Sequence, residues 1–238
     1  MRPYIPNCKH SHLPDNAAEF IIIQQDLKLT PMLNESSIMT RIHLTEELAY
    51  EGLTVEKAIA NRRSQRDFTS EIISLAELSH LLYYSSGITD KREGLRAAPS
   101  AGATYPIEVY AIVNNVESLA RGIYHYLIES NALELQREGD FRNEMSRAAL
   151  QERMFKQANA IVALSAVFQR TQQRYRERAQ RYICFEAGHI AQNTYLAATS
   201  LGLGACAIGA FYDDEFNRLL GLDGKNESVL YLLAVGKI

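Results

Sequence analysis

Small and apolar side chains recur at steps of three or four between about Tyr175 and Leu201, a period that predicts the longest helix of the chain. The repeating positions are Ala179, Ile183, Ala187, Ile190, Thr194, Ala197 and Leu201. Because many of these side chains are small, we expect this face to pack closely against another helix. Gly202 and Gly204 follow at once and are expected to end the helix.

Shorter helices are indicated by their capping residues. Thr54, with Glu56 in the first turn, predicts a helix through Ala60. Ser74 and Glu77 form a Ser-x-x-Glu capping box at the start of another helix, which Gly87 can end. Two more helices are expected, over residues 140–157 and from an Asp213 cap to Leu220.

Short apolar runs bounded by turn residues predict the strands. They cover residues 108–113, 122–128, 133–137, 161–168, 205–208 and 228–235. Glu129-Ser130-Asn131 is typical of a hairpin turn between the second and third of these strands. Helices and strands follow one another without strict alternation, so the order predicts an α+β fold.

The first 53 residues differ from the rest. They hold Pro3, Pro6, Pro14 and Pro31, which are four of the six prolines, and only Phe20–Ile23 is typical of a strand. We therefore expect residues 1–53 to be an N-terminal arm or extension that packs on the main body or on a partner subunit. Residues 54–238 are expected to form the main domain.

Composition narrows the class of protein. Hydrophobic residues make up 47% of the 238 residues and charged residues 22%, as in ordinary soluble globular proteins. A net charge of −3 carries no electrostatic sign of binding to nucleic acid or to a membrane surface. Three widely spaced cysteines, an N-terminus without an apolar signal core and the lack of a run that could span a bilayer favour a cytoplasmic protein. Cys8, His10 and His12 lack a second ligand set with zinc spacing, so no metal site is expected.

Three segments could carry chemistry, and each has an alternative interpretation. Arg62-Arg63-Ser64-Gln65-Arg66 suits a cofactor phosphate, but cations are also typical of a solvated helix end. The small residues of 99–106, flanked by prolines, would let a flat ring approach the backbone, or they form an ordinary turn. Residues 201–211 either expose backbone N–H groups after a short strand or form a helix cap and a tight turn.

Taken in this order and at this spacing, the three segments resemble the nitroreductase family of FMN flavoproteins from about residue 53 onward. Within that family the chain is similar to the SagB/ThcOx-type branch, which includes dehydrogenases that oxidise azolines in ribosomal peptide natural products. The supporting motifs are Arg62–Arg66, Pro99–Ala103, Gly122-x-Tyr124-His125-Tyr126, Arg181-Tyr182 with Glu186-x-Gly188-His189 and Gln192-Asn193, Leu201–Gly204, and Ile208–Phe211. The resemblance implies a nitroreductase-like fold, with a central, mostly antiparallel sheet flanked by helices, in a homodimer.

The resemblance also implies a role for each motif. Arg62 and Arg66 would hold the FMN phosphate, while Arg63 and Ser64 would reach the ribityl chain or the pyrimidine edge. The turn formed by Ile208, Gly209 and Ala210 would lie near flavin N5. The loop formed by Pro99, Ser100, Ala101, Gly102 and Ala103 would cover the isoalloxazine from the other subunit.

Two departures from the family pattern leave the reaction open. The azoline-oxidising members have a Lys-Tyr pair before the long helix, thought to act as base and acid, where this chain has Arg174-Tyr175. Arginine is a poor general base because it does not readily deprotonate, although Tyr175 remains available. Many members also place a basic pair beyond the last strand, where only Lys237 could serve here.

Three functions therefore stay open. The first is a SagB-type FMN-dependent dehydrogenase that oxidises azolines in a modified peptide. The second is a nitro or quinone reductase that takes electrons from NAD(P)H. The third is a flavin-binding scaffold in a peptide-modifying complex with a cyclodehydratase partner.

Overall fold

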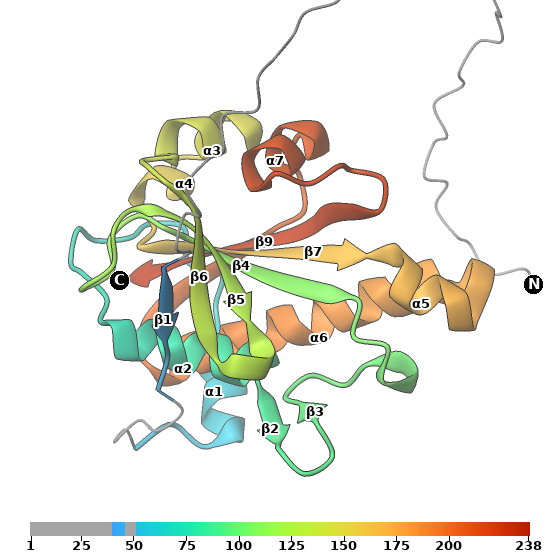
Figure 1. Cartoon of the computed structure of the whole chain (residues 1–238). Helices are drawn as coiled ribbons and strands as arrows, with labels where there is room; N and C mark the ends of the chain where they lie inside the picture. The colour runs from blue at the N-terminus through green and yellow to red at the C-terminus, as the bar shows by residue number, and fades with distance from the viewer. Residues whose placement is uncertain (1–39, 46–50) are drawn as a thin grey trace, which may run out of the picture. The chain divides into compact units, whose positions relative to one another are not determined.

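The computed structural model describes residues 40–45 and 51–238 (Figure 1). The predicted strand Phe20–Ile23 and most of the predicted N-terminal arm lie outside the described residues. The proposed boundary near residue 53 thus remains a prediction. One piece before that boundary, β1 (Arg41–His43), pairs with a strand of the main sheet.

A seven-stranded sheet with the order β1-β6-β5-β4-β7-β9-β8 forms the centre of the fold (Figure 1). Every pair of neighbouring strands in it is antiparallel, as expected for this fold class. The remaining strands are β4 (Ile107–Val113), β5 (Gly122–Leu127), β6 (Ala132–Glu138), β7 (Ala160–Val167), β8 (Leu203–Ile208) and β9 (Glu227–Lys237). A separate two-stranded hairpin, which the sequence analysis did not predict, pairs β2 (Ile88–Asp90) with β3 (Leu95–Arg96).

Helices cover both faces of the sheet (Figure 1). Alternate side chains of the central strands therefore enter two different cores. On one face lie α1 (Val55–Asn61), α2 (Leu75–Ser86) and α6 (Ala179–Ser200), and on the other lie α3 (Arg142–Ala148), α4 (Met154–Gln157) and α7 (Asp213–Leu220). In β4, Val109 packs in the first core and Ile112 in the second. This two-sided burial explains why the strands appear in the sequence as nearly continuous apolar runs.

The predicted caps are confirmed for the first two helices. The Glu77 amide donates to Ser74 Oγ at 3.1 Å and the Ser74 amide to Glu77 Oε2 at 2.7 Å, which completes the capping box. Thr54 Oγ1 accepts from the Lys57 amide at 3.4 Å. For α7 the prediction was one residue off, because Tyr212 occupies the N-cap position and Asp213 is the first helical residue.

Two predicted helices are broken in the structure. The helix expected from Tyr175 is preceded by a separate helix, α5 (Phe168–Tyr175). Arg176, at φ 49° and ψ −124°, ends α5 and begins a 3₁₀ turn that leads into α6. The helix expected over 140–157 splits into α3 and α4, with Leu150 at φ 55° and Gln151 at φ 67° between them. Neither break contains glycine or proline, so nothing in the local composition marks it.

Candidate functional site

The residues Arg62–Arg66, which we call the arginine segment, run from the end of α1 along β8. Arg62 is the C-cap of α1 and its extended backbone, at φ −54° and ψ 124°, turns the chain out of the helix. Ser64 then forms a parallel bridge with Ala205, and the Gln65 amide donates to the Ala205 carbonyl at 2.9 Å. The approach needs a glycine in β8, because a Cβ on Gly204 would lie 2.9 Å from Gln65 Cβ.

Tyr195 of α6 joins the arginine segment to β8. Its hydroxyl accepts from the Ala207 amide at 2.7 Å and lies 3.0 Å from Ser64 Oγ. The Arg62 guanidinium carbon lies 5.1 Å from the centroid of the same ring, a cation–π distance. Two of the three predicted segments thus meet at one side chain. The sequence analysis did not single out Tyr195. Its only signal was that a side chain with a hydroxyl group lies on the buried face of the long helix.

The guanidinium groups of the arginine segment are not neutralised within the described part of the chain. Arg63 Nη1 donates to the carbonyls of Ala60 at 2.9 Å and Arg62 at 2.8 Å, which is the helix-end role that the sequence left open. No carboxylate of residues 40–45 or 51–238 forms an ion pair with Arg62, Arg63 or Arg66. A cluster of three fixed positive charges without a carboxylate partner among the described residues suits a phosphate.

Lys237 lies at the end of β9 and is already paired. Its Nζ lies 2.6 Å from Glu77 Oε1 of α2. Burial alone would raise the pKa of Glu77, but hydrogen bonds from Lys237 and Ser74 and the Lys237 charge outweigh it and lower that pKa. A phosphate role for Lys237 remains a prediction, and it requires the ammonium group to leave Glu77.

The turn after β8 presents exposed backbone. Gly209 and Ala210 are exposed, whereas Ile208 before them is buried. A Cβ on Gly209 would meet only Tyr231 Cε2, at an ordinary 3.9 Å. No close neighbour within the described chain therefore requires glycine at this position, and the turn is open to a ligand.

Residues 99–105, the loop 99–105, adopt an uncommon backbone shape. Gly102, Ala103 and Tyr105 have φ of 59°, 52° and 43°. Two of the three carry a Cβ, and a left-handed residue other than glycine costs about 1 kcal/mol or more. Such a conformation persists only where the surrounding structure holds it.

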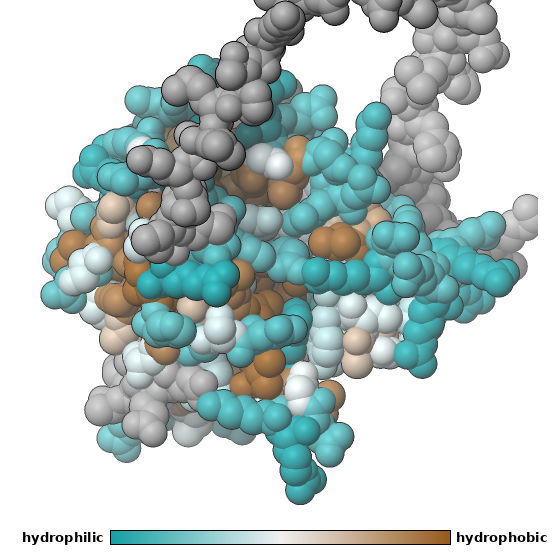
Figure 2. All heavy atoms as spheres, in the orientation of Figure 1, coloured by the Kyte–Doolittle hydropathy of each residue, from teal (hydrophilic) through white to brown (hydrophobic). Residues whose placement is uncertain are grey.

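Helix α5 supplies most of that support. Arg174 Nη1 donates to the Gly102 carbonyl at 2.9 Å, and Arg170 Nη1 donates to the Tyr105 carbonyl at 3.0 Å. Between them, the hydroxyl groups of Thr171 and Thr104 lie 2.9 Å apart. The predicted catalytic pair Arg174 and Tyr175 thus lies against the predicted flavin loop. Other exposed side chains of α5 are polar, and they form hydrophilic surface on the right of Figure 2.

Glu186 of α6 holds the other side of the loop. Burial raises the pKa of its carboxyl to about 7, against the hydrogen bond from Ser100, the charge of Arg96 and the hydrogen bond from the Ile107 amide. Ser100 Oγ in turn accepts from the Tyr105 amide at 2.9 Å. Sequence reasoning used Glu186 only as a motif position, although a carboxylate on the packed face of a helix was a signal that it has a partner.

The three predicted segments do not form one site within a single chain. The arginine segment and the turn after β8 meet at Tyr195, whereas the loop 99–105 meets α6 at Glu186. Nine residues separate these two positions, which corresponds to about 13 Å along a helix. No hydrogen bond or ion pair of the described residues joins the arginine segment to the loop.

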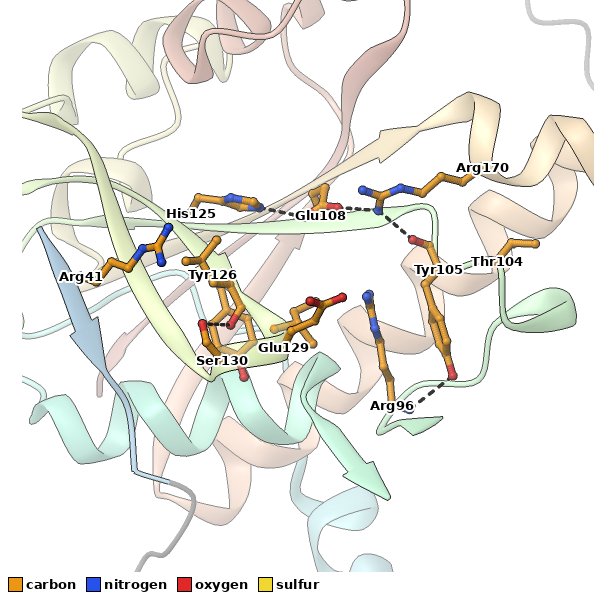
Figure 3. Close-up of a pocket in the computed structure, with 12 residues that line it drawn as sticks. Arg41, Arg96, Thr104, Tyr105, Glu108, His125, Tyr126, Glu129, Ser130 and Arg170 are labelled. Carbon is orange, nitrogen blue, oxygen red and sulfur yellow. Dashed lines mark hydrogen bonds and ion pairs between the residues drawn. The ribbon is translucent and has the colours of Figure 1, made fainter. Parts of the chain in front are cut away.

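A charged pocket of about 640 Å³ lies beside the loop 99–105 and shares Thr104 and Tyr105 with it (Figure 3). Glu108 is central to its polar contacts, because His125 Nε2 lies 2.8 Å and Arg170 Nη1 2.5 Å from its carboxylate oxygens. Burial alone would raise the pKa of Glu108, yet these two neighbours lower it. Arg96 completes the wall, its guanidinium carbon 4.4 Å from the Tyr105 ring centroid. Two residues that line the pocket, Arg170 and Arg96, therefore support the loop through their contacts with Tyr105.

In residues 40–45 and 51–238, no group of three or more His, Cys, Asp or Glu side chains is placed to bind a metal ion. Within the same ranges, no helix has the length and apolar character needed to cross a membrane.

Comparison with known proteins gives a family match over most of the chain. The model of the nitroreductase family matches residues 59–237. The predicted nitroreductase MJ1384 of Methanocaldococcus jannaschii is 39% identical over 79% of this chain and 92% of that protein. The trifolitoxin-processing protein TfxB of Rhizobium leguminosarum bv. trifolii is 30% identical over 68% of this chain and 47% of its own length. The microcin B17-processing protein McbC of Escherichia coli is 28% identical over 70% and 63%. The chain thus spans less than two thirds of both processing proteins.

Solved structures share the fold. A predicted nitroreductase from Anabaena variabilis superposes with a TM-score of 0.74 and 28% identity, over 84% of this chain and 42% of that one. The E. coli microcin synthetase McbBCD complex with truncated pro-MccB17 bound gives 0.64 and 22%, over 83% and 78%. The NADPH:FMN oxidoreductase of Vibrio harveyi complexed with NAD⁺ gives 0.56 and 19%, over 76% and 67%. The last two, at such low identity, show the fold alone. Together with the family match, these structures confirm the predicted nitroreductase-like α+β fold.

Proposed function

The chain belongs to the nitroreductase family, and from that premise we propose that it is an FMN-dependent oxidoreductase of the SagB/ThcOx type that acts on a modified peptide. Membership of the family supports an oxidoreductase. The cofactor, the branch and the substrate class are the proposal.

The observation that carries the proposal is the arginine segment, which runs along β8 with three guanidinium groups and no carboxylate partner among residues 40–45 and 51–238. Arg62 and Arg66 would hold the FMN phosphate, with Arg63 and Ser64 toward the ribityl chain and the pyrimidine edge. The exposed backbone of Gly209 and Ala210 would face the ring. When bound, FMN would supply a two-electron acceptor, and the protein would supply position and electrostatics.

The separation of the two halves along α6 supports a homodimer. If the loop 99–105 of one copy covers the flavin held by the arginine segment of another, both segments belong to one site although they contact α6 at Glu186 and Tyr195. A two-fold arrangement would create two such sites.

The proposal that this chain modifies a peptide is supported by two relatives, whose names describe the processing of trifolitoxin and microcin B17. The structure of the McbBCD complex, which has a similar fold, contains a truncated precursor. We extend this to a peptide substrate and a cyclodehydratase partner for this chain. Tyr175 is the residue that we propose as proton donor or acceptor, because arginine is a poor general base.

One observation favours a second candidate, a nitro or quinone reductase that takes electrons from NAD(P)H. The chain covers 92% of the predicted nitroreductase MJ1384, a far larger share than it covers of the peptide-processing proteins. The two candidates share the flavin and differ in the electron donor.

The test begins with the purified full chain, which should be yellow and should release FMN on denaturation. Folded protein that stays colourless after incubation with FMN would overturn the proposal. Anaerobic mixing with NADPH then separates the candidates: rapid bleaching of the flavin favours the reductase. Slow or absent bleaching, with oxidation of an azoline-containing peptide, favours the dehydrogenase.

A further inference from the structure

Side chains of two helices hold the loop 99–105 at four of its residues. From α6, Glu186 accepts a hydrogen bond from Ser100. Three other loop positions are contacted from α5 by Arg174, Thr171 and Arg170. These loop contacts involve Gly102, Thr104 and Tyr105. A Cβ on Gly102 would also lie 2.6 Å from the Tyr175 hydroxyl. The remaining bond is internal, from the Tyr105 amide to Ser100 Oγ at 2.9 Å.

Arg174 has a particular place among these anchors. It is the last residue but one of α5, its side chain is exposed, and its Nη1 donates to the carbonyl of Gly102, the left-handed residue at the centre of the loop. Its guanidinium carbon lies 5.6 Å from the Tyr175 ring centroid, and that ring packs edge-on against Tyr182 at 4.7 Å. The planar guanidinium thus lies between an aromatic side chain and a loop carbonyl.

We propose that Arg174 is a positioning residue rather than a general base, and that it holds the loop 99–105 in the shape that covers the flavin. The claim that Arg174 holds the loop depends only on the contacts of Arg174. The claim that the held loop covers the flavin rests on the proposed function. Arginine suits the anchoring role because its charge is permanent and its donors have a fixed planar arrangement. The same properties make it unsuitable as a base.

The anchoring is tested without flavin by hydrogen exchange of the loop amides in Arg174→Ala. Ala103 and Thr104 donate to carbonyls within the loop, and Tyr105 donates to Ser100 Oγ. We expect these amides to exchange at least about tenfold faster in the variant, because local opening of the loop becomes easier. Arg178→Ala is the matched control, since it removes the same charge from an exposed residue of the adjoining 3₁₀ turn. Equal exchange in the two variants would overturn the proposal.

Gly102→Ala tests the contact between Arg174 and Gly102 by changing the loop residue instead of the arginine. A Cβ there would lie 2.7 Å from Arg174 Nη1 and 2.6 Å from the Tyr175 hydroxyl. Gly94→Ala is the control, because Gly94 has a similar φ, 68°, and no neighbour within 4 Å of an added Cβ. We expect faster loop exchange only in Gly102→Ala, and a smaller effect when Arg174 is already alanine. Fully additive effects would show that the two residues are independent.

The flavin part is tested by titration with FMN, followed by flavin fluorescence and by the visible spectrum. We expect Arg174→Ala to raise the Kd about tenfold, equivalent to about 1.4 kcal/mol, and to shift the bound spectrum toward that of free FMN. Arg174→Lys keeps a donor for the Gly102 carbonyl and should recover most of both. Unchanged affinity and spectrum in Arg174→Ala would overturn this part. Lack of FMN binding by the unmodified protein would overturn the proposed function, while the exchange experiment would still decide the anchoring.

Discussion

The arginine segment and the loop 99–105 both lie against α6, yet their polar groups are satisfied in opposite ways. The guanidinium groups of the arginine segment have no carboxylate partner in the described part of the chain. The Arg62 guanidinium lies over the ring of Tyr195. The loop is bonded throughout by Arg174, Thr171, Arg170 and Glu186. We infer that the first region is completed by a ligand, whereas the second is organised before any ligand arrives.

The largest effect should come from removing the charge of the arginine segment. In Arg62→Ala/Arg66→Ala we expect FMN binding to weaken by roughly 4 kcal/mol, about what two charged hydrogen bonds contribute. Calorimetric titration of the apoprotein with FMN measures the loss. The same double change at two exposed arginines elsewhere, Arg153 and Arg218, is the control. A comparable loss in both double variants would mean that the arginine segment is not the phosphate site.

A smaller effect is expected from the buried carboxyl behind the loop. Because burial raises the pKa of Glu186 from its ordinary value to about 7, the folded protein binds a proton that the unfolded chain releases. The contribution of Glu186 to stability is thus largest below its ordinary pKa and decreases as the pH rises toward about 7. Its slope is at most about 1.4 kcal/mol per pH unit.

Urea unfolding at several pH values, compared with Glu186→Gln, isolates this contribution. The glutamine keeps the hydrogen-bonding shape but cannot ionise, so the variant should gain stability relative to the unmodified protein as the pH rises from 5 to 7.5. Parallel stability curves for the two proteins would show that Glu186 does not titrate in this range.

The smallest effect should follow from the loss of Lys237. Its ammonium is paired with Glu77 in a half-exposed contact, which contributes about 0.5 kcal/mol to folding. We expect Lys237→Ala and Glu77→Gln to lower stability by similar small amounts and FMN affinity far less than the double arginine change. If Lys237→Ala instead weakens FMN binding as much as Arg62→Ala alone, Lys237 leaves Glu77 to bind the phosphate.

Local signals predicted most of the elements. The Ser74–Glu77 capping box, the strand over 108–113 and the apolar face of α6 depend on side chains within a few residues of one another, and the structure has all three. The break at Arg176 was not predicted, because the residue is neither glycine nor proline. The short strand β1 was also missed, because its three residues are defined by their pairing with β6.

The amino-acid sequence by itself determined which residue types were available for the chemistry. It placed three arginines after a helix, small residues in a proline-flanked loop, and an Arg-Tyr pair ahead of the long helix. Only the tertiary structure decided what these residues contact. Tyr195 reaches Ser64 across 131 positions, and Arg174 reaches Gly102 across 72. Contacts at that separation depend on how α6 packs against the sheet and α5 against α6, which no local pattern of side chains records.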